Sequence, residues 1–201
     1  MDTGTIISSP TRDPDWLKKC AITGLILLIP IAGALNLMGW MKAVYERAKV
    51  GDQTLPEPGL EYIGSGWALF LALLPAFLVV LAWNIVVVTL TAMDLNVAAS
   101  IGQLIGFVLQ LGINLVLMPA MTYRHVVHGK GLADAFDVPD ITRVITTNTG
   151  VFVNFALVAF LASLIGGLGV VACCIGVIVT GPFGAAISGV NLSAFEQHAR
   201  V

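Results

Sequence analysis

Charged residues are scarce in this sequence. Only 11% of its 201 residues are Asp, Glu, Lys or Arg, whereas 57% are apolar. A soluble domain carries about 25% charged residues, because these residues cover its surface. The helices of a soluble bundle would also need one polar face, and the long apolar segments of this chain have none. The composition therefore argues against a soluble fold and predicts an integral membrane protein.

Four stretches of the chain lack charge altogether. They are Cys20–Met41, Tyr62–Met93, Leu95–Tyr123 and Val144–Phe195. About 20 mainly apolar residues in helical form suffice to cross the hydrocarbon core of a bilayer. The last stretch is long enough to cross twice, and the glycines within 166–169 mark the place for a turn. We expect helices here, because a helix satisfies its own backbone groups in hydrocarbon.

The uncharged stretches and the loops between them predict a single membrane domain. Its expected parts are a polar leader (1–19), a first apolar segment (20–41), a loop (42–65), spans at 66–92 and 97–121, a second loop (122–143), spans at 144–165 and 168–192, and a tail (196–201). Within them, Pro30 and Gly33 predict a bend in the first segment, and Gly181-Pro182 predicts a break in the last span, because proline removes a helical hydrogen bond.

Local signals predict where three helices begin. Asp15 is expected to cap a helix that starts at Trp16, and Pro139 favours a helix start at Asp137 or Val138. A short interfacial helix is expected near 131–136, in the second loop.

The positive residues favour one topology. Lys and Arg collect in cytoplasmic loops. If 20–41 enters the membrane and returns, then the leader, both loops and the tail share one side, with all ten Lys and Arg residues. If 20–41 crosses, Arg12, Lys18 and Lys19 lie on the other side. We therefore predict an all-α integral membrane protein with four transmembrane helices plus a broken or re-entrant N-terminal hydrophobic segment, with both termini cytoplasmic. Five transmembrane helices are the alternative.

Ionisable groups are missing from the interior of every predicted span. Proton relays and ion-coupled pumps usually need such groups at depth. The spans contain amides instead. Gln103, Gln110 and Asn114 are spaced seven and four residues apart, which places them on one face of a helix. This candidate polar stripe could line a polar cavity, although hydrogen bonding between helices is the commoner role of such residues.

Small and metal-binding residues give weaker signals. Gly102 and Gly106 form a candidate helix-packing face, either within the chain or between two chains. The three cysteines are interpreted as packing residues. His125 and His128, with Asp134 nearby, offer too few ligands for a defined metal site. We therefore assign no catalytic residue, no cofactor and no metal.

Three stretches resemble a known family. The first is Asp15-Trp16-Leu17-Lys18-Lys19, followed by Gly24, Pro30-Ile31, Gly39 and Arg47; the second is Gly51 with Leu55-Pro56-Glu57; the third is Pro119-Ala120, Tyr123, Gly131-Leu132, Ala135-Phe136-Asp137, Ile141 and Asn148. Their order resembles the bacterial and archaeal membrane proteins called domain of unknown function 4013, which often have an aromatic residue where this chain has Pro58. The resemblance implies an all-helical fold in a bacterial (inner-membrane) or archaeal cytoplasmic membrane, and it implies no activity.

Three functions remain open from the sequence. The first is a non-enzymatic subunit, scaffold or lipid-interacting component. The second is a channel or transporter for a small neutral solute that uses the amide stripe. The third is a membrane-interface enzyme that uses His125, His128 and Asp134 or Asp137. Expected partners are membrane lipids and, through glycine packing, a second copy or another membrane subunit. We expect no nucleic-acid partner.

Overall fold

The structure is a computed structural model that describes residues 2–131, 134, 137–169 and 176–199. These residues form helices and connecting turns, and no strand occurs among them. The elements are α1 (Thr3–Ser8), the 3₁₀ helix η1 (Ser9–Arg12), α2 (Trp16–Leu27), α3 (Ala32–Lys49), α4 (Ile63–Ala92), α5 (Asn96–Gly112), the π-helical turn η2 (Ile113–Leu117), α6 (Met118–His128), α7 (Val138–Thr146), α8 (Thr149–Leu168) and α9 (Val177–Ala199).

Four helical segments in the described part of the chain are long and apolar enough to cross a membrane. They are α4, the continuous helix Asn96–His128, α8 and α9. The predicted class, an all-α membrane protein, is therefore confirmed. The second of these helices extends past the expected end at 121, because Pro119 does not stop it. The helix absorbs the missing N–H by widening to a π-turn just before this proline.

The N-terminal apolar segment is broken. Helix α2 ends at Leu27, a turn occupies residues 28–31, and α3 begins at Ala32. Ile31 has a φ of 64°, which a β-branched residue rarely adopts. Gly33 lets the two helices approach closely, since a Cβ there would lie 2.3 Å from the Ile26 carbonyl oxygen. The turn exposes apolar side chains, Leu28 at 64% and Ile31 at 78%, which suits contact with hydrocarbon.

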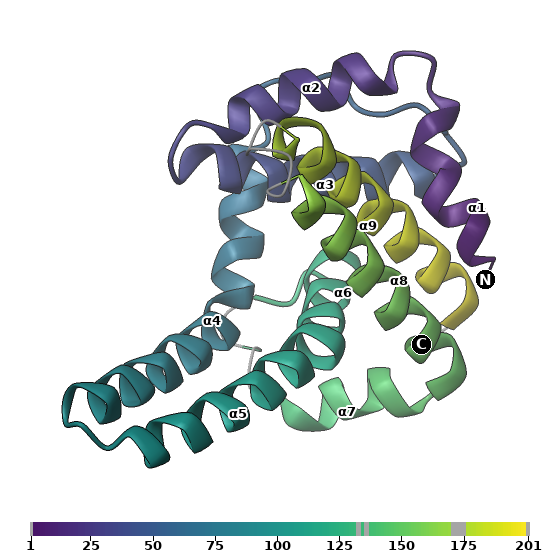
Figure 1. The fold of residues 1–201 in the computed structure, drawn as a ribbon. Helices are drawn as coiled ribbons and strands as arrows, with labels where there is room; N and C mark the ends of the chain where they lie inside the picture. Colours follow the sequence, from purple (N-terminus) through teal and green to yellow (C-terminus); the bar gives the residue numbers. More distant parts are fainter. Residues whose placement is uncertain (1, 132–133, 135–136, 170–175, 200–201) are drawn as a thin grey trace.

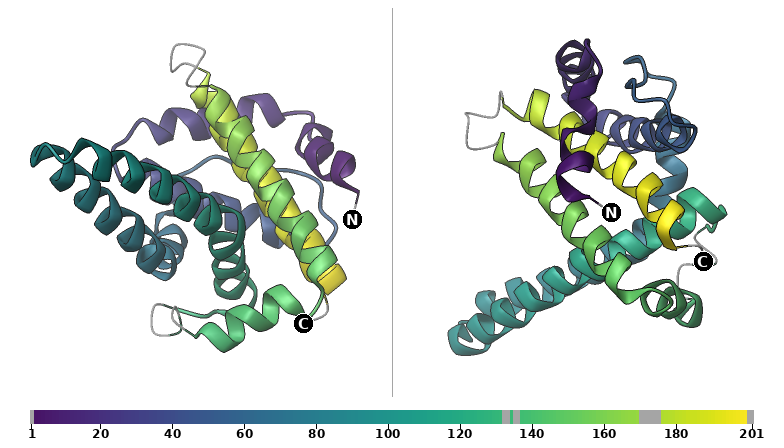
Figure 2. Two further views of the ribbon diagram at one scale, coloured as in Figure 1. Left: turned by 60° about the horizontal axis from the view of Figure 1, so that its bottom comes forward. Right: turned by 90° about the vertical axis from the view of Figure 1, so that its right-hand side faces the viewer.

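The helices form two diverging hairpins (Figures 1 and 2). Helices α8 and α9 pack side by side as an antiparallel pair, and α2 and α3 both lie against α9. The α4–α5 hairpin extends away from this assembly, so that the outer parts of α4 and α5 contact mainly each other. The core lies where α3, α4, α6, α8 and α9 meet, around Tyr123, Phe155 and Phe195.

Helix α9 runs through Gly181 and Pro182 without interruption, so the expected break is absent. Pro182 cannot donate to the carbonyl of Ile178, one turn earlier. Gly24 of α2 packs onto that carbonyl, because a Cβ at Gly24 would lie only 1.7 Å from its oxygen. The proline therefore frees an oxygen at the place where α2 crosses α9, and α9 continues through it as one helix.

Other boundaries also differ from expectation. Asp137 caps α7 by accepting from the Asp140 N–H, and α7 begins at Val138 as expected, but it ends at Thr146. Helix α8 then starts separately at Thr149 and ends at Leu168, whereas the sequence analysis placed this span at 144–165. The described part of the last span begins at Val177 and extends to Ala199, beyond the expected 192. Most of the proposed interfacial helix at 131–136 and the pair Cys173-Cys174 lie outside the described residues.

The short length of α2 predicts that the segment 20–41 does not cross the membrane. Helix α2 has 12 residues, which is about 18 Å of helix, short of the roughly 30 Å needed to cross. We expect Ser8→Cys in the leader and Gln53→Cys in the first loop, both exposed, to react with a membrane-impermeant maleimide from the same side of sealed vesicles. All native cysteines are first replaced by alanine.

Met93→Cys at the α4–α5 turn, where Met93 is 63% exposed, is the matched control and should react from the opposite side only. Labelling of Ser8→Cys and Gln53→Cys from opposite sides would instead establish a full crossing by 20–41.

Candidate functional site

A buried ion pair joins the leader to the first loop. The Lys19 ammonium lies 3.1 Å from Asp13 Oδ2 and 3.0 Å from Glu57 Oε1, and it donates to the Leu55 carbonyl at 2.8 Å. Asp13 Oδ2 also accepts from the Leu55 N–H at 2.7 Å. Asp13 is 2% exposed and Lys19 is 8% exposed. We call Asp13, Lys19, Leu55 and Glu57 the leader clamp.

Opposing effects set the charge state of the clamp. Burial alone would raise the pKa of Asp13, but hydrogen bonds from the N–H groups of Leu55 and Asp15 and from Lys19 outweigh it and hold that pKa below its usual value. Burial alone would lower the pKa of Lys19, but its bonds to Glu57 and Asp13 outweigh it and raise that pKa. Both groups are therefore charged at neutral pH.

The predicted cap at Asp15 is replaced by one from Asp13. The Asp15 side chain makes no capping bond at the start of α2. Asp13 Oδ1 instead accepts from the Asp15 N–H at 2.8 Å. One carboxylate thus orders the start of α2 and binds the loop.

Two further ionic contacts tie the other charged segments together. Lys49 at the end of α3 lies 2.7 Å from Glu196 of α9, whose carboxylate also accepts from the Tyr45 hydroxyl at 2.7 Å. Arg124 of α6 is 2% exposed and bonds Asp140 at 2.8 Å. The Tyr123 ring packs edge-on against Phe195, with centroids 4.8 Å apart. The leader is therefore bound to the first loop, and the C-terminal part of α9 is bound to the end of α3 and to α6.

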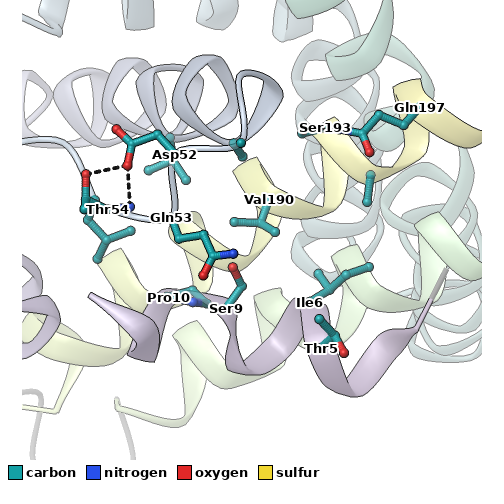
Figure 3. A pocket seen from close by; sticks show the side chains of 15 residues that line it. Thr5, Ile6, Ser9, Pro10, Asp52, Gln53, Thr54, Val190, Ser193 and Gln197 are labelled. Carbon is teal, nitrogen blue, oxygen red and sulfur yellow. Dashed lines mark hydrogen bonds between the residues drawn. The ribbon is translucent and has the colours of Figure 1, made fainter. Parts of the chain in front are cut away.

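A shallow polar pocket lies beside the leader clamp (Figure 3). Its volume is about 220 Å³, and it lies between α1 and η1, the first loop and the C-terminal part of α9. Its polar side chains are Thr5, Ser9, Asp52, Gln53, Thr54, Ser193 and Gln197. Asp52 is already engaged, since it accepts from the backbone and hydroxyl of Thr54. The lining contains no cation or histidine, and its other polar side chains are hydroxyl and amide groups that offer hydrogen bonds.

The amide stripe lies on the outside of the α4–α5 hairpin. Gln103, Gln110 and Asn114 are all exposed. Two grooves between α4 and α5 are lined by them together with Asn84. Among the described residues the Gln103 and Gln110 side chains accept or donate no hydrogen bond, while Asn114 donates to its own helix at the Gln110 carbonyl.

The glycine face of α5 is occupied within the chain. Trp83 of α4 lies over Gly106, where a Cβ would come within 2.6 Å of the indole nitrogen, and it donates to the Gly102 carbonyl at 2.9 Å. Val87 lies 3.2 Å from the Cβ position of Gly102. These glycines therefore hold α5 against α4.

Asn114 stands where three cavities meet, in the π-turn of η2. One is the groove toward α4, of about 300 Å³. Another, of about 320 Å³, lies between α5 and α8 and is lined by Phe107, Gln110, Leu111, Asn114, Phe160 and Ser163. The third, of about 210 Å³, extends into the core between α3, α4, α6, α8 and α9. Ser163 of α8 and Ser188 of α9 also line the third cavity, and no sequence spacing predicts that they lie beside Asn114.

The residues considered for metal chemistry do not converge. His125 bonds the Lys130 carbonyl at 2.8 Å, and His128 packs against the Tyr123 ring. Asp137 serves as a helix cap. Within the described ranges, no group of three His, Cys, Asp or Glu side chains could hold a metal ion, and Cys20 is a buried free thiol.

The leader clamp predicts a specific stability change. Lys19→Met leaves Asp13 buried without its cation, and we expect a loss of about 3 kcal/mol in unfolding free energy at pH 7, measured in detergent. Lys18→Met, at an exposed position, should change little. The pKa of Asp13 lies below its usual value of 3.8, so its stabilising charge is lost only as pH falls below about 4, and the difference between wild type and Lys19→Met should shrink from about pH 4 to pH 2. A pH-independent difference, or none, would show that the clamp is not a buried charge pair.

Comparison with known proteins gives one match. Residues 22–181 match the family model described as "Protein of unknown function (DUF4013)". No curated protein and no solved structure matches the chain. The matched residues include the second half of α2, all of α3, the first loop, α4 to α8 and the start of α9. The chain therefore belongs to the DUF4013 family of proteins of unknown function.

Proposed function

We propose that this protein is a non-enzymatic membrane component that binds the apolar part of a membrane lipid in the cavity beside Asn114. The observation that carries the proposal is a pair of neighbouring cavities that share Asn114 and Ser163 in their walls. Both residues line the cavity between α5 and α8 and also the one that extends into the core.

The inner cavity has the chemistry of a lipid site. Its walls are mostly apolar, with contributions from Met38, Met41, Leu69, Leu73, Met118, Pro119, Phe155, Ala159 and Leu192. A few hydroxyl and amide groups, from Asn114, Thr122, Ser163 and Ser188, stand among them. Ligand sites commonly combine apolar walls with a small number of polar groups that fix orientation. Methionines add adaptable surface, which suits flexible chains.

The outer cavity supplies a route from the bilayer. It lies where the α4–α5 hairpin diverges from α8 (Figures 1 and 2). Phe107 on its rim is 66% exposed, and Leu111 is 37% exposed. These side chains belong to helices that are long and apolar enough to span. A lipid chain would enter sideways from the hydrocarbon and meet the hydrogen-bonding groups at Asn114 and Ser163.

The two rival functions have less support. A solute channel needs a polar path enclosed by protein, whereas the amides Gln103 and Gln110 line grooves that open on the outside of the hairpin. An interface enzyme needs converging acid, base or metal ligands, whereas His125, His128 and Asp137 are engaged separately.

Filling the inner cavity tests the proposal. Ala159→Phe adds a ring at the cavity wall, and we expect it to reduce labelling by a diacyl phospholipid with a photoactivatable group at the chain end at least about fivefold. Wild-type labelling should map to peptides of η2 and α8. The measurement is peptide mass spectrometry after irradiation in vesicles of that phospholipid.

Leu157→Phe is the matched control, because Leu157 lies two residues away on α8 and is 51% exposed. It places the same phenyl ring on the outer surface of α8 and should leave η2 labelling unchanged. Equal labelling of wild type and Ala159→Phe, with both proteins equally folded by thermal unfolding, would overturn the proposal.

A further inference from the structure

The outer face of the α4–α5 hairpin has unmet polar groups at membrane depth. Gln103 and Gln110 lie 7 and 14 residues beyond Asn96, where α5 starts. At 1.5 Å per residue these positions are about 10 and 21 Å from the hairpin turn. Both therefore fall within a hydrocarbon core of about 30 Å. Acyl chains offer no hydrogen-bonding group there, so lipid alone leaves these amides unsatisfied.

The hydrogen-bonding capacity of this face is self-complementary. Asn84 donates to the Val80 carbonyl of its own helix and Asn114 to the Gln110 carbonyl, so each has an oxygen left to accept. Gln103 and Gln110 have both amide groups free among the described residues. An identical face turned through a two-fold axis brings donors opposite acceptors, because each amide carries both.

The fold leaves this face open to another chain. The glycines that could have formed a contact between chains, Gly102 and Gly106, are covered by Trp83 and Val87 of the same chain. The hairpin extends away from the α8–α9 pair, and in the described part of the chain no other helix lies along the groove lined by Asn84, Gln103 and Gln110. Polar side chains that hydrogen-bond across helices are a principal source of association within membranes.

We propose that two copies of this chain associate through the α4–α5 hairpin, with Asn84, Gln103 and Gln110 of one copy hydrogen-bonded to the same residues of the other. The contact is isologous, with the two-fold axis along the membrane normal and beside Gln103, so Gln103 lies near the Gln103 of the second copy. It buries the grooves between α4 and α5, and it does not use the inner cavity that we assign to lipid.

Cysteine crosslinking tests the geometry. In a chain without native cysteines, Gln103→Cys should form a disulfide-linked dimer in bilayers under mild oxidation. Ile101→Cys is the control, because Ile101 is 55% exposed and points about 160° away around the helix. It should remain monomeric at the same protein density. Equal crosslinking at the two positions would contradict the proposed dimer. Crosslinking of Gln103→Cys only to a different protein in native membranes would also show that the partner is not a second copy.

Removal of the amides tests the energetic claim. The double variant Asn84→Leu/Gln103→Leu keeps side-chain size and suits a lipid-facing surface. Loss of the interhelical hydrogen bonds should weaken dimerisation on the order of tenfold, measured by single-molecule photobleaching in vesicles of graded protein density. Thermal unfolding should show that the variant is folded. A folded variant that dimerises like wild type, or a wild type that is monomeric throughout, would contradict the proposal.

Ala159→Phe separates this inference from the lipid site. Dimerisation should be unchanged in Ala159→Phe, and inner-cavity labelling should persist in the double variant. If Ala159→Phe dissociated the dimer, the dimer contact would depend on the inner cavity, and the proposed contact through the amides alone would be wrong.

Discussion

The bond network of Lys19 is the constraint on which the rest of the structure depends. A buried ammonium is tolerated only with anionic and carbonyl partners around it, and these come from the leader and from the first loop, 36 residues further along the chain. The network therefore fixes both flanks of the N-terminal apolar segment beside each other. With its flanks joined, that segment turns back at 28–31 instead of continuing as one helix.

The prolines show how packing decides the fate of a helix. Pro30 lies in the turn between α2 and α3, where the chain reverses. Pro119 lies within a continuous helix, because the π-turn before it shifts the hydrogen bonds. The same π-turn contains Asn114. Pro182 frees the Ile178 carbonyl, and Gly24 packs against it. Proline therefore accompanies a chain reversal at Pro30, a π-turn beside a cavity at Pro119 and a helix crossing at Pro182, depending on what packs around it.

The sequence predicted the features that depend on local composition. Uncharged stretches correctly indicated the helical membrane class and four apolar helices, because a span needs length and low charge only. The break between α7 and α8 was missed, although residues 146–150 are a run of Thr, Asn and Gly that favours a turn. The clamp was also missed. It pairs Asp13 with Leu55, a contact that no spacing rule indicates. The stripe at Gln103, Gln110 and Asn114 was found by helical periodicity, but the serines that join Asn114 come from α8 and α9 and required the fold.

The membrane depth of the turn at 28–31 shows directly whether the segment 20–41 enters the membrane and returns to the same side. A fluorophore on Ile31→Cys, which is 78% exposed, can be quenched by nitroxides placed at graded depths along phospholipid chains. If the Lys19 network joins the two flanks on one side, a turn about 18 Å from the start of α2 lies within the hydrocarbon. The account predicts strongest quenching by deep nitroxides and no reaction with water-soluble quenchers on either side. Quenching by a water-soluble reagent added only to the side opposite the leader would contradict it.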